Sequence, residues 1–443
     1  MAGRLTVVVI GGGIGGLCLA QRLRKAGVGV GVYERDRAAG SRWEGYRIYV
    51  NPAGSRSLRA CLPDPLWAAF LATSGVAGPI CWLTEQLDEL VVVEESVLCP
   101  QGAADPAENH YAVDRRTLRR LLLSGLEDVV HFGAEFRRYE HTADGRVAAF
   151  FADGRRVVGD VLVGADGAGS RVRRQYLPQA GHVDAGVGGV AHKFYLTAEN
   201  RTWVPRQLQR GMNSVVVDGP VQMFTAVYDP PPGARAALER IAVPPAENLD
   251  APYLLCALNA DPAVLPEALT SLDDAALRRT VDELVADWHP ALRRILAESD
   301  PASRGAIRFT ASVEVAPWES SAVTVLGDAI HTMPPLGGFG GNTALRDARL
   351  LGGLLAEADR GERDLLDAVR HYEDGMREHG YAAIRAALRM RDRALRTGAV
   401  GALAVRTWFR LCRALPALRR RTFSPPPDAV VAPRPWERPG ARV

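Results

Sequence analysis

The sequence has very little lysine, no cysteine pair at metal-binding spacing and no long apolar run. Lysine occurs only at Lys25 and Lys193, so nearly all of the positive charge is arginine. The formal net charge of +3 over 443 residues is close to neutral, and the basic residues are not gathered in tracts. This argues against a nucleic-acid-binding protein. No segment approaches the roughly 18 consecutive apolar residues of a membrane span, so we expect none.

The six cysteines and the N-terminus indicate a reduced, cytoplasmic protein. No two cysteines have C-x-x-C spacing and no His/Cys cluster accompanies them, so we expect neither a metal site nor a disulfide framework. The apolar run Leu5–Ile10 continues directly into glycines. It therefore predicts a buried strand and not a signal peptide.

The order of apolar segments predicts an α/β fold. Hydrophobic residues make up 47% and charged residues 24%, as in globular proteins, and the length favours two interlocked domains. A strand at Thr6–Ile10, a helix at Gly15–Lys25 and a strand at Val28–Tyr33 begin a parallel, doubly wound sheet. The continuous apolar runs Val161–Ala165 and Ala322–Leu326 predict further buried strands of that sheet.

A region of different character interrupts this first domain. Between residues 186 and 260, short strands separated by Pro/Gly-rich turns predict an antiparallel sheet, and one helix is expected over Asp273–Ala297. After Ala344 the chain is predicted to be helical to Arg421, followed by an irregular, proline-rich tail, Pro425–Val443. The expected boundaries are 1–180 and 301–360 for the Rossmann-type domain, 181–300 for the antiparallel-sheet domain, and 361–443 for the C-terminal helices and tail.

A glycine-rich turn follows the first strand. The run Gly11-Gly12-Gly13-Ile14-Gly15-Gly16 satisfies G-x-G-x-x-G between a strand and a helix. Gly11 permits the tight turn, Gly13 lets the backbone approach a pyrophosphate, and Gly16 packs the helix on the strand. Glu34, at the end of the second strand, is placed to bind ribose hydroxyls. This arrangement predicts a dinucleotide site for FAD or NAD, and the motif does not separate the two.

Two further segments follow buried strands. Asp166-Gly167 precedes a helix that begins near Ser170. Gly327-Asp328 ends another strand, and a glycine-rich loop then leads to a helix that begins near Asn342. A carboxylate at that strand end can hold a ribityl hydroxyl, and the helix start can direct N–H groups at the negative edge of a reduced isoalloxazine.

Together these segments resemble the class A flavoprotein monooxygenases, the para-hydroxybenzoate hydroxylase family. The resemblance implies that the first motif binds the ADP part of FAD, that Asp166 is the D-G aspartate and that Asp328 is the G-D aspartate. Gly338-Phe339-Gly340-Gly341-Asn342 is similar to the family's run beside the flavin ring, with phenylalanine in place of the usual glutamine. The predicted cofactor-binding residues are Gly11, Gly13, Ile14, Gly15, Gly16, Glu34, Arg35, Arg115, Asp166, Asp328, Gly340, Gly341 and Asn342.

Other candidates are weighed against simpler interpretations. Arg115 begins a segment similar to the family's arginine-x-x-leucine helix start and is the expected FAD-contacting arginine. Arg47 could contact the flavin or an anionic substrate group, or form an ordinary salt bridge; Phe224 and Pro335 are the other predicted substrate contacts. For His331 a structural role is favoured over a catalytic one. No convincing catalytic acid or base is found.

The resemblance implies a monooxygenase that uses FAD, NADPH or NADH and O2. A flavin C4a-hydroperoxide would hydroxylate an aromatic or polycyclic small molecule such as a secondary metabolite, while the protein orients the reactants and excludes water. A flavin-dependent epoxidase, a non-oxygenating FAD dehydrogenase and a non-catalytic flavin-binding protein remain alternatives. A halogenase is disfavoured because neither lysine is suitably placed and no W-x-W-x-I-P segment occurs.

The segment Ala402–Arg420 mixes apolar residues with arginines. It could lie on a membrane surface. Packing across the two domains is favoured instead, because Pro416 interrupts the pattern and the family's members end in packed helices. The oligomeric state is left open.

Overall fold

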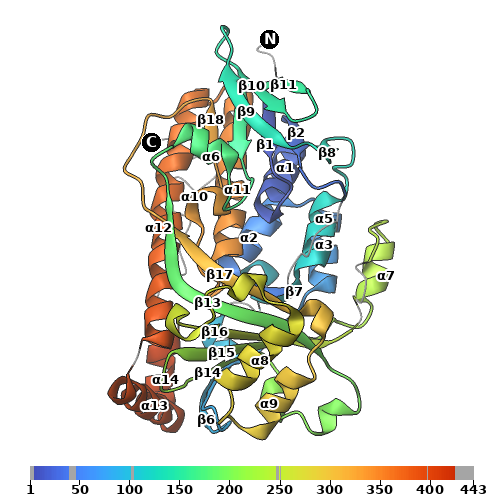
Figure 1. Ribbon diagram of the computed structural model, residues 1–443. Helices are drawn as coiled ribbons and strands as arrows, with labels where there is room; N and C mark the ends of the chain where they lie inside the picture. The colour runs from blue at the N-terminus through green and yellow to red at the C-terminus, as the bar shows by residue number, and fades with distance from the viewer. Residues whose placement is uncertain are drawn as a thin grey trace.

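The computed structural model describes residues 4–38, 46–100, 104–245, 249, 251–396 and 398–424. Figure 1 shows an upper part built on a parallel sheet and a lower part built on a larger sheet. The long helix α12 (Leu365–Leu395) runs along both parts. The predicted tail, Pro425–Val443, lies outside the described residues.

The upper part contains a five-stranded parallel sheet with the order β18-β12-β1-β2-β8. Its strands are β1 (Thr6–Ile10), β2 (Gly29–Tyr33), β8 (Val130–His131), β12 (Val161–Gly164) and β18 (Val323–Val325). The first strand lies between β12 and β2, so the chain reverses its direction of travel across the sheet there. Open α/β sheets bind ligands at such a point, beyond the carboxyl ends of the strands.

Helices cover this sheet and connect its strands. They are α1 (Ile14–Ala26), α2 (Pro52–Cys61), α3 (Asp64–Thr73), α5 (Arg115–Leu123), α6 (Arg171–Tyr176), α10 (Asp328–His331) and α11 (Phe339–Asp359). The first helix packs closely on α11, because a Cβ at Gly15 would lie 2.7 Å from Leu326 and 3.3 Å from Ala344. Glycine is needed at that position to bring the two helices together beneath the site.

Two smaller sheets flank the parallel one. One has the order β3-β7-β4 and consists of β3 (Arg47–Val50), β7 (Tyr111–Asp114) and β4 (Gly75–Val76). The other has the order β11-β10-β9 and consists of β9 (Phe136–His141), β10 (Val147–Phe151) and β11 (Arg156–Gly159).

The lower part is a seven-stranded sheet with the order β17-β13-β16-β15-β14-β5-β6. Its strands are β5 (Ile80–Leu83), β6 (Glu89–Val93), β13 (His182–Tyr195), β14 (Met212–Val215), β15 (Val221–Tyr228), β16 (Tyr253–Ala260) and β17 (Gly305–Ser312). All neighbouring pairs are antiparallel except β14 with β5. Three of the strands, β5, β6 and β17, come from outside residues 181–300, and the exact domain boundaries stay a prediction.

Side-chain alternation divides this sheet into two different faces. On β15, Met223 and Val227 belong to a core beneath α8 (Asp274–Leu284) and α9 (Pro290–Ala297). Phe224 and Tyr228 belong to an aromatic cluster on the opposite face, next to β3. Figure 1 shows α8 and α9 on the side of the sheet away from the parallel sheet. The aromatic face therefore lies between the two parts of the molecule.

The prediction of a single helix over Asp273–Ala297 is wrong. The first helix ends at Leu284, and a second begins at Pro290 after a short turn. Proline lacks an N–H group and its ring clashes inside a helix, so it begins a new one at the first position. His289 caps this second helix by accepting a hydrogen bond from Ala291 N at 3.1 Å.

The remaining helices are α4 (Glu95–Leu98), α7 (Ala234–Glu239), α13 (Ala399–Ala414) and α14 (Pro416–Phe423). The last two form a pair at the lower corner of the molecule (Figure 1). The mainly helical C-terminal region is thus confirmed, with the predicted break at Pro416. None of the described helices combines the length and the apolar character that crossing a membrane requires.

Candidate active site

The glycine-rich turn has the geometry that a phosphate site requires. Gly11 has φ +108°, and a Cβ there would lie 2.4 Å from the Ala165 carbonyl oxygen, so only glycine fits. A Cβ at Gly13 would meet nothing within 4 Å. Gly13 begins α1 without a side-chain cap, so the first N–H groups of the helix face open space. This is an anion-binding arrangement.

Glu34 closes one side of this turn. Its carboxylate is buried and accepts hydrogen bonds from Gly12 N at 2.7 Å and Asp36 N at 2.9 Å. These bonds fix the acid at the end of β2, as the sequence predicts, and each carboxylate oxygen can still accept a further bond. Arg35, the next residue, is exposed.

An arginine that is not among the predicted residues contacts the glycine turn. Arg119 is buried on α5, and its Nε donates to the Gly12 carbonyl at 3.1 Å. Arg115, one turn earlier on α5, is exposed, and its role toward FAD stays a prediction. The spacing of four residues places both side chains on the same side of the helix, which is the signal that could have included Arg119.

Asp166 lies at the carboxyl end of β12, beside the glycine turn, and caps α6. Its oxygens accept hydrogen bonds from Ser170 Oγ at 2.5 Å and Arg171 N at 2.7 Å. The structure therefore gives Asp166 a clear role in ending one element and starting the next. Any additional contact with a cofactor stays a prediction.

The Gly327-Asp328 turn is held from below by a buried carboxylate. Asp347, on α11, accepts hydrogen bonds from Gly327 N at 2.9 Å, His331 Nε2 at 2.6 Å and His379 Nε2 at 2.6 Å. Asp347 and His331 are fully buried, whereas Asp328 is exposed on the opposite side of the turn. The structural role expected for His331 is confirmed.

Burial and neighbouring charges act in opposite directions on the pKa values of these three side chains. Burial opposes ionisation of Asp347, but the charge of His331 and the hydrogen bonds of both histidines hold its pKa below its usual value. Burial would lower the pKa of His331, yet the neighbouring Asp347 raises it. For His379, burial dominates and lowers the pKa. Burial and the neighbouring charges thus favour an ion pair of Asp347 with His331, bonded to a neutral His379, and the Nδ1 of His331 has no partner among the described residues.

The loop before α11 forms a second uncapped helix start. Gly338 has φ +66° and begins α11 without a side-chain cap. Asn342 is buried and joins three segments: its Nδ2 donates to the Tyr49 and Gly338 carbonyls at 2.8 Å, and its Oδ1 accepts from Asn51 N at 2.9 Å. A Cβ at Gly341 would meet nothing within 4 Å, so space remains over the helix start. Pro335, in the same loop, is exposed.

Several other helices differ from α1 and α11 in this respect, although α3 and α13 also begin without a side-chain cap. The helices α2, α5 and α12 have side-chain caps, from Asn51, Asp114 and Asp364. The two glycine starts thus keep their N–H groups available at the carboxyl end of the parallel sheet. These residues fit a flavin dinucleotide.

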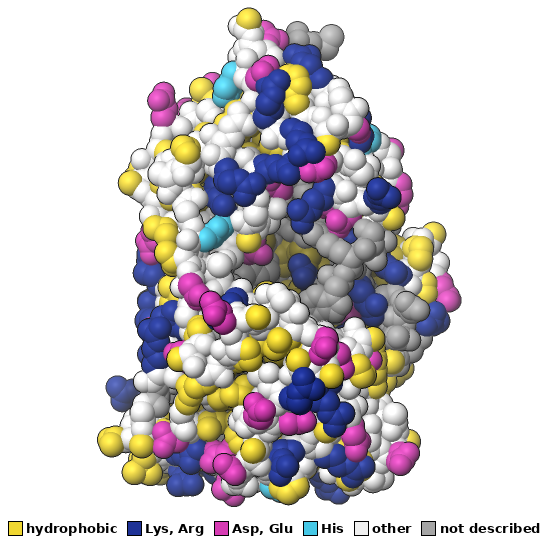
Figure 2. Space-filling model, viewed as in Figure 1, with side chains coloured by type: hydrophobic (Ala, Val, Ile, Leu, Met, Phe, Trp, Pro, Cys, Tyr) yellow, Lys and Arg dark blue, Asp and Glu magenta, His cyan; other side chains and the backbone are white. Residues whose placement is uncertain are grey.

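The aromatic face of the lower sheet lies against β3. Tyr46, Tyr49, Tyr195 and Phe224 pack around Tyr228 and Tyr253. The Tyr49 hydroxyl bonds to Nδ1 of His110 at 2.9 Å, and a Cβ at Gly338 would lie 3.5 Å from Tyr49. The aromatic cluster therefore adjoins the glycine-rich loop that precedes α11. In the space-filling view the molecule is hollowed between its upper and lower parts (Figure 2).

Two buried cations face this cluster without an acid partner among the described residues. Arg47 is 5% exposed; its Nε donates to the Val227 carbonyl at 3.0 Å, and its buried Nη2 has no partner. Lys193 is 6% exposed, with Nζ 4.4 Å from the centroid of the Tyr253 ring. Burial lowers the pKa of Arg47 to about 10 and also lowers that of Lys193. A salt bridge of Arg47, one of the two interpretations from the sequence, is not found with any residue that the structure describes.

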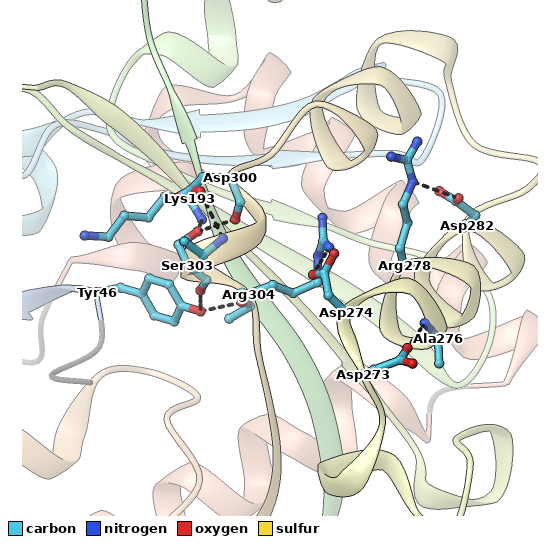
Figure 3. Close-up of polar contacts among 12 residues, drawn as sticks. Tyr46, Lys193, Asp273, Asp274, Ala276, Arg278, Asp282, Asp300, Ser303 and Arg304 are labelled. Carbon is cyan, nitrogen blue, oxygen red and sulfur yellow. Dashed lines mark hydrogen bonds and ion pairs between the residues drawn. The ribbon is translucent and has the colours of Figure 1, made fainter. Parts of the chain in front are cut away.

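Figure 3 shows how Lys193 is placed. Its backbone N donates to Ser303 Oγ at 2.8 Å, and the Tyr46 hydroxyl donates to the Ser303 carbonyl at 2.7 Å. The Lys193 side chain extends away from Arg304, which is buried and paired with Asp274. One cation of this region is thus neutralised by a carboxylate, and the other is directed toward the aromatic face.

Comparisons with known proteins agree with this geometry. Residues 115–387 match the family described as FAD binding domain, and residues 9–62 match an NAD(P)-binding Rossmann-like domain. A candidate FAD-containing monooxygenase from Photorhabdus luminescens subsp. laumondii is 34% identical with a TM-score of 0.78, over 88% of this chain and 99% of that chain. HpxO of Klebsiella pneumoniae, solved with FAD and uric acid, shares the fold at 22% identity and a TM-score of 0.75, over 96% of this chain and 98% of HpxO.

A curated relative extends the comparison. The dual O-methyltransferase/FAD-dependent monooxygenase CTB3 of Cercospora beticola is 32% identical over 391 residues, which are 84% of this chain and 44% of CTB3. This chain thus spans less than half the length of CTB3. The fold and site define a flavin-binding α/β protein. The chain belongs to the family of FAD-dependent monooxygenases and hydroxylases, and FAD is its cofactor.

Proposed function

We propose that the protein is a monooxygenase that uses NAD(P)H and O2 to hydroxylate an aromatic or polycyclic substrate. One observation carries the proposal: the uncapped start of α11 adjoins an aromatic face that also presents the cation of Arg47. FAD, when bound, supplies the hydride acceptor and the chemistry of oxygen activation. The C4a-hydroperoxide route and the choice between NADH and NADPH stay predictions.

The residues of the upper part would hold the cofactor. The N–H groups at the start of α1, from Ile14 onward, would bind the pyrophosphate, and Glu34 would accept bonds from the ribose. Asp328 would hold the ribityl chain. The N–H groups at the start of α11, at Gly340 and Gly341, would stabilise negative charge on the ring edge.

The residues of the lower part would choose and orient the substrate. An aromatic face favours a planar apolar molecule, because ring faces bury large apolar areas and stack on one another. A buried guanidinium without a carboxylate favours a substrate with an anionic group, such as a phenolate. HpxO binds uric acid, an acidic ring compound, in the same fold. Burial of Arg47 and Lys193 would also keep bulk water from the reacting ring.

The test begins with the purified protein and its flavin spectrum. We expect bound FAD, slow NAD(P)H oxidation in air, and strong stimulation by one member of a panel of phenols and polycyclic phenolates. With ¹⁸O₂ the product should gain one labelled oxygen atom. Stimulated oxidation without labelled product would favour the dehydrogenase alternative, and labelled epoxide would favour the epoxidase. Failure to bind FAD would overturn the cofactor site itself.

Gly13→Ala tests the proposed pyrophosphate position separately. The position has ordinary backbone angles and free space, so the protein should fold with alanine there. The methyl group would occupy the place of the phosphate, and we expect at least tenfold weaker FAD binding in titration. Gly353→Ala, on α11 and also with free space, is the matched control and should bind FAD normally. Equal affinity of both variants would contradict the assignment.

A further inference from the structure

The helix pair at the lower corner has one face that packs and one that does not. On the packed face, Phe409 contacts Trp82, and Cys412 is buried against β6. Arg406 pairs with Glu85 at 2.7 Å and Arg413 donates to the Glu89 carbonyl at 2.7 Å. The segment thus packs on the lower sheet, and these contacts fix which side of α13 faces outward; the expected packing across the two domains stays a prediction.

The outward side of α13 carries a continuous apolar stripe. Its large members are exposed by 43–84% and follow one another at intervals of three to five residues, at Val400, Leu403, Trp408, Leu411 and Leu415. This spacing places them on one side of a helix, over about 22 Å at 1.5 Å per residue. Hydrophobic side chains are visible at this corner in Figure 2. Single exposed apolar residues are normal, but an aligned stripe marks an interaction surface.

The charge of the surrounding residues indicates which kind of partner binds the stripe. Residues 399–424 contain six arginines and no aspartate or glutamate. Arg410, Arg420 and Arg421 are exposed and form no ion pair with any residue that the structure describes. Arg410 follows Leu403 by two helical turns, so it flanks the stripe. A helix with Trp and Leu on one side and unpaired arginines beside them suits an anionic lipid surface.

We propose that the outward side of α13, together with the arginines of α14, binds the surface of an anionic phospholipid membrane. A second copy of the chain is a poorer occupant, because pairing two stripes would bring six unpaired arginines together without an acid. The helix pair also projects from the corner of the fold (Figure 1), and a lipid surface can deform around a convex helix. The proposal does not depend on the reaction.

The test is co-sedimentation of the full chain with extruded vesicles. We expect binding to phosphatidylcholine vesicles with 30% phosphatidylglycerol at least tenfold tighter than to phosphatidylcholine alone, and weaker binding at high salt. Leu403→Gln with Leu411→Gln should weaken it at least tenfold, and Arg420→Gln with Arg421→Gln should remove the preference for anionic lipid. Val76→Gln with Leu366→Gln, which changes exposed apolar residues elsewhere, is the matched control and should bind as the native chain does.

Three results would overturn the proposal. The first is no binding to the anionic vesicles at low salt. The second is equal binding by the Leu403/Leu411 variant and the native chain. The third is a dimer in light scattering that this variant dissociates, since a second copy would then cover the stripe.

Discussion

Two groups of buried charged residues differ in how their charges are paired. The closed cluster consists of Asp347, His331 and His379, and the open cluster consists of Arg47 and Lys193. The carboxylate of Asp347 receives three hydrogen bonds, from Gly327 N, His331 and His379. The guanidinium of Arg47 receives no carboxylate, and its Nη2 has no partner in the described structure. Both groups carry charge in a setting where an unpaired charge is costly. The closed cluster supports the scaffold, and we propose that a ligand completes the open one.

The largest effect is expected from opening the closed cluster. Asp347→Ala leaves His331 without its counter-charge and Gly327 N without an acceptor, which should lower the free energy of unfolding by about 3–5 kcal/mol. Urea denaturation followed by circular dichroism measures this. Asp367→Ala removes a carboxylate from a surface pair and should cost at most about 1 kcal/mol. Similar losses in both variants would contradict a supporting role for Asp347.

Arg47→Met should weaken ligand binding without lowering the stability of the fold. It removes a buried cation that has no acid partner among the described residues, so the free energy of unfolding should stay unchanged or rise. Binding of the stimulating phenolate should weaken by about 1.5–3 kcal/mol, roughly ten- to hundredfold. Arg304→Met is the control, because Arg304 is buried but paired with Asp274. It should lose stability and keep its affinity for the phenolate; the same pattern in Arg47→Met would show that Arg47 is structural.

The closed cluster could be predicted from the sequence only in part. Gly327-Asp328 and His331 lie in one recognisable segment, and a structural role for the histidine followed from its position. His379 lies on another helix, 32 residues beyond Asp347, and no local pattern joins the two. A signal for Asp347 existed: it is an acid within the apolar series Ala344, Leu345, Ala348, where burial requires a partner.

The open cluster was less accessible to sequence reasoning. The glycine turn and Glu34 are contiguous features of strand–turn–helix–strand order, so their positions could be predicted. Arg47 and Lys193 both lie near Tyr253 only because β3 and the seven-stranded sheet face each other, and this sheet takes strands from three distant parts of the chain. On β15, Phe224 and Met223 point to opposite faces of the sheet. The sequence shows only two adjacent apolar residues and does not indicate which of them faces the site.

The pH dependence of stability provides a finer test of the closed cluster. Burial lowers the pKa of His379, so the folded state keeps the neutral form, and stability should fall as the pH drops below the ordinary histidine value of about 6.5. Asp347 raises the pKa of His331, so its contribution is present at low pH and is lost as the pH rises through that raised value. Each unit of difference corresponds to about 1.4 kcal/mol.

Two variants separate these opposing slopes. His379→Gln should flatten the loss on the acid side, and His331→Gln should flatten the loss on the alkaline side, in urea midpoints measured between pH 5 and pH 8. His371→Gln, which changes a histidine outside the cluster, is the control and should leave the alkaline-side slope unchanged. An unchanged acid slope in His379→Gln would show that His379 does not titrate in this way.

The smallest effect compares two glycines of α11. Neither position has an atom within 4 Å of a Cβ, so Gly341→Ala and Gly353→Ala should each raise the free energy of unfolding of the FAD-free protein by about 0.5–1 kcal/mol. Saturating FAD should add less stability to the Gly341 variant, because the new methyl group would occupy space beside the flavin ring. A tenfold weaker affinity would remove about 1.4 kcal/mol of that added stability. Thermal denaturation without FAD measures the change in intrinsic stability, and denaturation with FAD measures the stability that the cofactor adds. If FAD stabilises the two variants equally, the open side of α11 is not where the ring binds, and the space above Gly341 needs another explanation.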